Sequence, residues 1–93
     1  MEQVNQYVYL LTSKSFTGYV KVGRSIRPQA DLINYNVTTP LRDFEFLTVL
    51  KVNDYKAAKR RLVNVFNTVC TSDTDWFKID SETAVKLTLE TLR

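Results

Sequence analysis

The chain has 93 residues, with 13 Lys and Arg against 10 Asp and Glu, and a formal net charge of +3 at pH 7. This length suits one domain with a modest core, so we expect residues 1–93 to form a single domain. No apolar stretch reaches membrane-spanning length, and the N-terminal residues lack a secretory signal pattern. The single cysteine, Cys70, and the absence of histidine exclude an intramolecular disulfide and argue against a zinc site. We therefore expect an intracellular protein, in the cytoplasm or nucleus, with no membrane partner and no metal site.

Two β-rich runs that lie close together in the sequence predict a hairpin. The first is Tyr7–Thr12, the second is Tyr19–Ser25, and a short polar connection that ends in glycine joins them. Because side chains alternate between the faces of a strand, Tyr9 occupies one face of the first strand, and Lys21 and Gly23 share a face of the second. A glycine at such a position leaves room for a ligand to approach the backbone.

The later sequence predicts three helices and one further strand. A short helix is expected over Gln29–Asn36, followed by a strand over Phe44–Val52 with apolar residues on both faces, which is typical of a central strand covered by helices on both sides. The strongest helix pattern covers Asp54–Asn67, with an apolar stripe that extends to Val69. A final helix, with Ser81 as its cap, is expected to end at Leu92.

Positive charge is concentrated in the first part of the chain. Residues 1–69 contain ten Lys and Arg against five Asp and Glu, a net charge of +5, whereas residues 70–93 contain three against five, a net charge of −2. Lys56 and Arg60 share the outer face of the predicted helix over Asp54–Asn67 with two asparagines, a pattern that suits phosphate oxygens. An ordinary solvated helix face is the alternative.

The hairpin resembles the start of the GIY-YIG nuclease superfamily. Tyr7-Val8-Tyr9 stands for the first motif of that superfamily, and Lys21-Val22-Gly23 stands for the second. The longer run Lys21-Val22-Gly23-Arg24-Ser25 is similar to the Lys-Ile-Gly-Arg-Ser/Thr motif of a short, single-domain viral and phage branch, and Asp75-Trp76-Phe77 resembles its Glu-Trp-Phe landmark. The resemblance covers nearly the whole chain. It implies an α+β domain with a three-stranded, mainly antiparallel sheet flanked by helices.

The resemblance also shows three departures from the catalytic pattern. Asp31 stands where relatives place a phosphate-binding arginine, so Arg27 is a candidate replacement, unless it forms only a surface ion pair with Asp31. Lys59 stands where relatives place the glutamate that binds a divalent metal, and Val63 replaces a histidine. A protonated lysine cannot coordinate Mg²⁺ but can meet a phosphate directly.

The leading hypothesis is therefore a catalytically inactive GIY-YIG-like domain that binds nucleic-acid backbone, DNA in preference to RNA, and needs no cofactor. The residues expected to bind are Lys21, Gly23, Arg24, Arg27, Lys56, Lys59 and Arg60.

Two alternatives remain. The first is a metal-dependent endonuclease that cleaves DNA with Mg²⁺ or Mn²⁺, in which Tyr7, Tyr9 and Lys21 are catalytic and Asp31 or Glu45 is a relocated metal ligand. The second is a viral or phage protein-interaction module with an aromatic patch around Tyr19, Phe16 or Tyr35.

Overall fold

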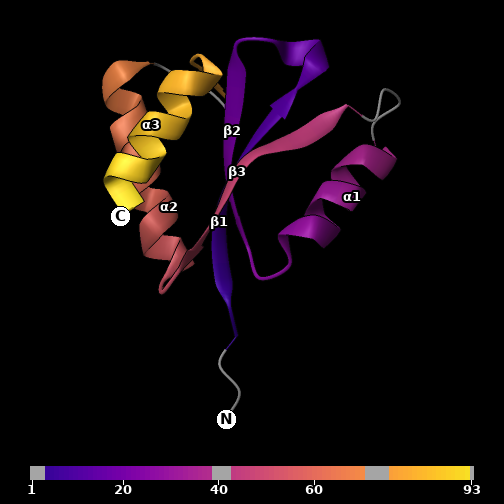
Figure 1. Ribbon diagram of the computed structural model, residues 1–93, viewed down its shortest axis with the longest axis horizontal. Coiled ribbons are helices and arrows are strands. Elements are labelled where there is room, and N and C mark those ends of the chain that lie inside the picture. The colour runs from indigo at the N-terminus through magenta and orange to yellow at the C-terminus, as the bar shows by residue number, and fades with distance from the viewer. Residues whose placement is uncertain (1–3, 39–42, 71–75, 93) are drawn as a thin grey trace.

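Four antiparallel strands form one sheet that lies between helices (Figure 1). The computed structural model describes residues 4–38, 43–70 and 76–92. In chain order the elements are β1 (Gln6–Ser13), β2 (Tyr19–Ser25), α1 (Pro28–Thr38), β3 (Phe44–Val52), α2 (Tyr55–Val69), β4 (Trp76–Lys78) and α3 (Ser81–Leu92). Within these residues, none of the helices combines the length and apolar character that a membrane span requires.

The predicted hairpin is confirmed as β1 and β2, which occupy the centre of the sheet in the order β3-β1-β2-β4. Their register places Tyr9 opposite Gly23 and Leu11 opposite Lys21, so these four side-chain positions share one face. Gly18, at the end of the connection, has a φ of +84°, a value that favours glycine.

The sheet has four strands, so the prediction of three strands was wrong. The additional strand, β4, has three residues and pairs with β2 only over Tyr19–Lys21. Three residues are too few to show an alternating pattern in the sequence, and only the pairing with β2 defines them as a strand. The predicted central position of β3 was also wrong, because β3 is an edge strand. It is apolar on both faces because Leu47 packs on the α2 side, whereas Phe46 lies against Tyr9 on the other face.

The main core lies on the face of the sheet covered by α2 and α3. Its buried members are Val8, Leu10, Val20, Val22, Ala58, Leu62, Phe66, Phe77 and Ala84. The apolar stripe predicted for α2 is confirmed in its middle, although Val69 at its end is 56% exposed. Phe77 meets Phe66 edge to face at 5.3 Å between ring centroids. The cap of α3 is Asp80 rather than Ser81, because the Asp80 carboxylate accepts a hydrogen bond from the Thr83 N–H at 3.0 Å.

On the opposite face, α1 is fixed to the beginning of β3 by one side-chain amide. Asn36 accepts a hydrogen bond from the Phe44 N–H at 3.0 Å and donates one to the Phe44 carbonyl at 3.1 Å, as a neighbouring strand would. At its N-terminal end, α1 begins at Pro28, because the Asp31 N–H donates the first hydrogen bond of the helix to the Arg27 carbonyl. These two attachments set the position of α1 over the sheet, and with it the position of Tyr35.

We predict that Asn36→Ala lowers the free energy of unfolding by about 1–3 kcal/mol, because the substitution leaves two partly buried backbone groups of Phe44 unpaired. Urea denaturation measures the change. Asn67→Ala is the matched control, because Asn67 is an exposed helical asparagine of α2 and its replacement gives the same gain in helix propensity. Equal unfolding free energies for the two variants would contradict the prediction.

Candidate functional site

The short length of β4 leaves part of the edge of β2 open. Among the described residues, no strand pairs with β2 on that side beyond Lys21. The helices α1 and α2 lie on opposite sides of the sheet (Figure 1), and residues of both helices line a hollow at this edge. The hollow has a volume of about 500 Å³, and we call it the polar hollow. It is lined by Tyr9, Lys21, Val22, Gly23, Arg24, Ser25, Ile26, Asp31, Tyr35, Tyr55 and Lys59.

Gly23 allows the Tyr9 ring to lie directly over β2. A Cβ atom at Gly23 would come within 2.5 Å of the Tyr9 Oη, far closer than two such atoms can approach. Tyr9 has little room to move aside, because it is only 3% exposed and its ring packs on Phe46 at 5.3 Å between centroids. The glycine therefore leaves the space that the Tyr9 phenol occupies in the polar hollow, and Phe46 supports the ring there.

Tyr9 and Tyr35 form a hydrogen-bonded phenol pair with unequal acidity. Burial raises the pKa of Tyr9 above its ordinary range, and the hydrogen bond with Tyr35 raises it further. Burial also acts to raise the pKa of Tyr35, but hydrogen bonds with Lys21 and Tyr9, together with the Lys21 charge, outweigh it and lower the pKa. The Lys21 Nζ lies 4.7 Å from the centroid of the Tyr35 ring. Tyr35 is thus the phenol of this pair that deprotonates more readily.

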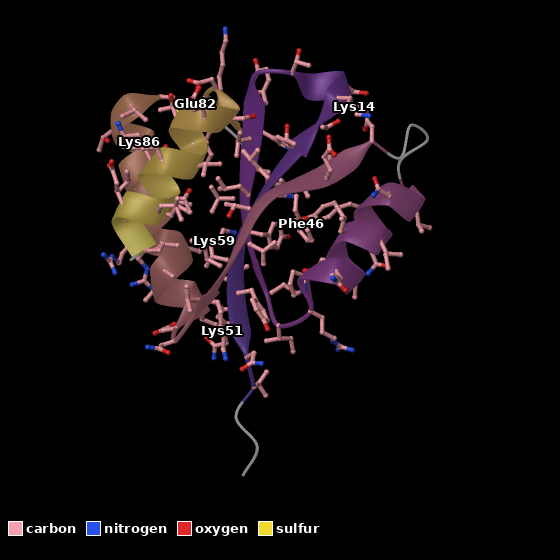
Figure 2. All side chains as sticks on the ribbon, viewed as in Figure 1. Lys14, Phe46, Lys51, Lys59, Glu82 and Lys86 are labelled. Atoms are coloured by element: carbon pink, nitrogen blue, oxygen red, sulfur yellow. The ribbon has the colours of Figure 1, made fainter. Side chains whose placement is uncertain are left out.

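Three cationic side chains line the polar hollow from two elements. Lys21 and Arg24 belong to β2, and the Arg24 guanidinium carbon lies 4.7 Å from the centroid of the Tyr55 ring at the beginning of α2. Lys59 follows Tyr55 by four residues, about one helical turn, and Figure 2 shows it on the side of α2 toward the sheet. Of the described residues that line the hollow, Asp31 is the only carboxylate. The side chains that line the hollow therefore carry more positive than negative formal charge.

This architecture agrees with a comparison of the sequence with known families, in which residues 6–92 match the T5orf172 domain. The chain belongs to the T5orf172 domain family. This phage-associated domain is related to nuclease folds of the GIY-YIG and HNH-like kinds, which supports a nuclease-like or DNA-binding character. Membership of the specific GIY-YIG branch stays a prediction. Neither a curated protein nor a solved structure matches the sequence significantly.

The donor atoms of this T5orf172 domain do not suit the single divalent metal that GIY-YIG catalysis implies. Mg²⁺ requires oxygen ligands, which are supplied chiefly by carboxylates, whereas three cations and one carboxylate line the hollow. Lys59, which the sequence resemblance aligns with the metal-binding glutamate of GIY-YIG nucleases, is one of these three cations. Nowhere in the described parts of the chain do three Asp, Glu, Cys or His side chains gather.

The T5orf172 domain brings together most of the residues that the sequence predicted for binding. Lys21, Gly23, Arg24 and Lys59 line the polar hollow. Tyr9 and Asp31, which were predicted for the endonuclease alternative, line it too.

The other predicted site residues lie elsewhere. Tyr7 and Arg27 line a separate hollow on the α1 side. Lys56 and Arg60 are exposed on α2, and Glu45 is exposed on β3. None of these five lines the polar hollow.

Sequence reasoning missed the role of Tyr35 and Tyr55. Tyr35 was expected only as part of an exposed aromatic patch, yet it lies between Tyr9 and Lys21. One available signal was its spacing of four residues from Asp31, which places both on one helical face. Tyr19 of the predicted patch is 39% exposed, and the side chain of Phe16 lies outside the described residues.

We predict that Tyr35 of this T5orf172 domain titrates below the ordinary tyrosine pKa and that Lys21→Met moves its pKa upward, because the variant removes both a hydrogen bond and a positive charge. Tyr9 is expected to titrate above the ordinary value. NMR of protein labelled with ¹³C at tyrosine follows each phenol separately. Lys56→Met is the control, and an equal shift in both variants would contradict the role assigned to Lys21.

Proposed function

We propose that this T5orf172 domain binds the phosphate backbone of nucleic acid, DNA in preference to RNA, at the polar hollow and does not cleave it. The observation that supports the proposal is the convergence of Lys21, Arg24 and Lys59 on one hollow with a single carboxylate. Cations that meet phosphates release condensed counterions, so such binding is independent of sequence and sensitive to salt.

Each cation suits a different part of this task. Lys59 supplies a compact positive charge where GIY-YIG relatives would hold a metal ion, and a phosphate oxygen can approach the ammonium directly. Arg24 rests against the Tyr55 ring, which restricts its rotamers before binding, while the N–H groups of a guanidinium can contact two phosphate oxygens together. Lys21 is hydrogen-bonded to Tyr35, so its charge stays within the hollow.

The exposed cations of α2 extend the proposed surface. Lys56 and Arg60 lie on the same helix as Lys59 but on its exposed side. We assign them to the neighbouring phosphates of the same strand, outside the polar hollow. The proposal includes an intracellular setting, in the cytoplasm or nucleus of an infected host cell, where nucleic acid is the abundant polyanion.

A second candidate function is a metal-dependent endonuclease, and one observation favours it. Tyr35 has a lowered pKa and lies in the hollow with Tyr9, so a phenolate could accept a proton from an attacking water. Asp31 is the carboxylate in reach, whereas Glu45 lies away from this site. The excess of cations over carboxylates favours phosphate binding over this alternative.

We predict that Lys59→Gln weakens binding to a fluorescent DNA duplex by about five- to tenfold at low salt and reduces the slope of log K against log salt by about one. Fluorescence anisotropy at several salt concentrations measures both quantities. Lys86→Gln removes the same charge from the exposed surface of α3 (Figure 2) and should change affinity less than twofold. Equal effects of the two substitutions, or binding that does not respond to salt, would rule out the polar hollow as the site.

Supercoiled plasmid distinguishes binding from cleavage. We expect the protein to retard intact plasmid on a gel in Mg²⁺ or Mn²⁺ without nicking it, because the hollow lacks a set of metal ligands. Nicking that disappears with a chelator and with Tyr9→Phe would instead establish the endonuclease. Unchanged migration in every lane would favour a protein partner.

A further inference from the structure

A second hollow, with a more apolar lining, lies beside the polar one. It has a volume of about 540 Å³ and lies between the sheet and the beginning of α1, and we call it the apolar hollow. Its walls include the rings of Tyr7 and Phe46 and the aliphatic side chains of Ile26 and Val49. Ile26 is 44% exposed and Val49 is 36% exposed, so apolar surface faces solvent here. A contiguous exposed apolar surface with a polar rim is typical of a ligand-binding groove.

The apolar hollow is adjacent to the proposed phosphate site. Ile26 lines both hollows, so the connection between β2 and α1 forms the rim between them. Arg24 lines the polar hollow and Arg27 lines the apolar one, and both side chains are exposed. A ligand that crosses this rim therefore meets positive charge on both sides and an aromatic, aliphatic surface on one side.

We propose that the apolar hollow receives an unstacked nucleobase of the strand whose phosphate occupies the polar hollow. A nucleobase has an apolar aromatic face, which suits Tyr7, Phe46 and Val49, and a polar edge, which the side chains of Gln29 and Arg27 in the same hollow can meet. The phosphate of the same nucleotide carries the negative charge that the cations of the polar hollow bind. An apolar side chain of a protein partner would fill the same space but would leave those cations without a counterpart.

This inference rests on the proposed backbone binding and narrows its substrate class. A fully paired duplex keeps its bases stacked, and extrusion of one base costs a few kcal/mol. The domain is therefore expected to prefer single-stranded or unpaired nucleic acid. It can still hold duplex more weakly through phosphate contacts alone, which lets the two proposals be tested separately.

The experiment compares three fluorescent ligands of equal length by anisotropy at low salt: a single strand, the same strand with abasic sites through its centre, and the duplex. With the wild-type protein we expect the intact strand to bind about tenfold more tightly than the abasic strand or the duplex, because base stacking on aromatic side chains contributes on that scale. This comparison needs no variant. Its result therefore does not depend on whether a mutant folds.

Two variants that each add one negative charge then test whether the base occupies the apolar hollow. Val49→Asp places a carboxylate in the apolar hollow and should reduce binding of the intact strand to the level of the abasic one. Val37→Asp makes the same charge change at a 67% exposed position of α1 outside the hollow and should leave the preference for the intact strand intact. Thermal melting verifies that both variants fold.

Each other outcome overturns a defined part of the argument. Equal affinity of the wild-type protein for all three ligands removes the base site and leaves phosphate binding in place. The wild-type protein could also prefer the intact strand while Val49→Asp and Val37→Asp change this preference equally. That result overturns the assignment of the base to this hollow. No binding of any ligand overturns both proposals.

Discussion

The close packing of the Tyr9 ring over Gly23 is the contact on which the candidate site depends. The register of β1 and β2 places these two residues opposite each other, and only a residue without a Cβ leaves space for the phenol. The phenol then reaches Tyr35 on α1, while Phe46 supports its other side. A change in register by one residue would turn Tyr9 toward the opposite face and remove the site, so the strand pairing and the chemistry are determined together.

The hydrogen bonds among Tyr9, Tyr35 and Lys21 give the site its electrostatic character. Burial raises the pKa of Tyr9, whereas the hydrogen bond with Lys21 lowers the pKa of Tyr35, so two phenols of unequal acidity lie side by side. Lys59 and Arg24 add positive charge that only Asp31 offsets among the described lining residues. A nuclease site concentrates carboxylates around a metal ion, whereas three cations and one carboxylate line the polar hollow. The proposed function follows from this lining, because the fold alone does not decide between phosphate binding and cleavage.

The sequence predicted the elements with long, regular patterns and missed those defined by pairing alone. The hairpin strands and the stripe of Ala58, Leu62 and Phe66 follow directly from periodicity, and the structure confirms them. The strand β4 is too short for a pattern. The edge position of β3 could not be predicted, because β3 carries apolar residues on both faces, as a central strand does. Six of the predicted catalytic, binding and metal-ligand residues meet in the polar hollow, namely Tyr9, Lys21, Gly23, Arg24, Asp31 and Lys59. Tyr35 was missed because its partners are distant in the chain.

By itself the sequence determined the local geometry of this protein: which long runs form strands or helices, and which side chains share a face. The tertiary structure decided which faces meet. It placed Tyr35 of α1 and Lys59 of α2 at the same open edge of β2, and it separated Tyr7 and Arg27 into a second hollow. The physical reason is the range of the interactions. Periodicity and capping act over a few residues, whereas the site depends on strand pairing and helix packing between residues that are far apart in sequence.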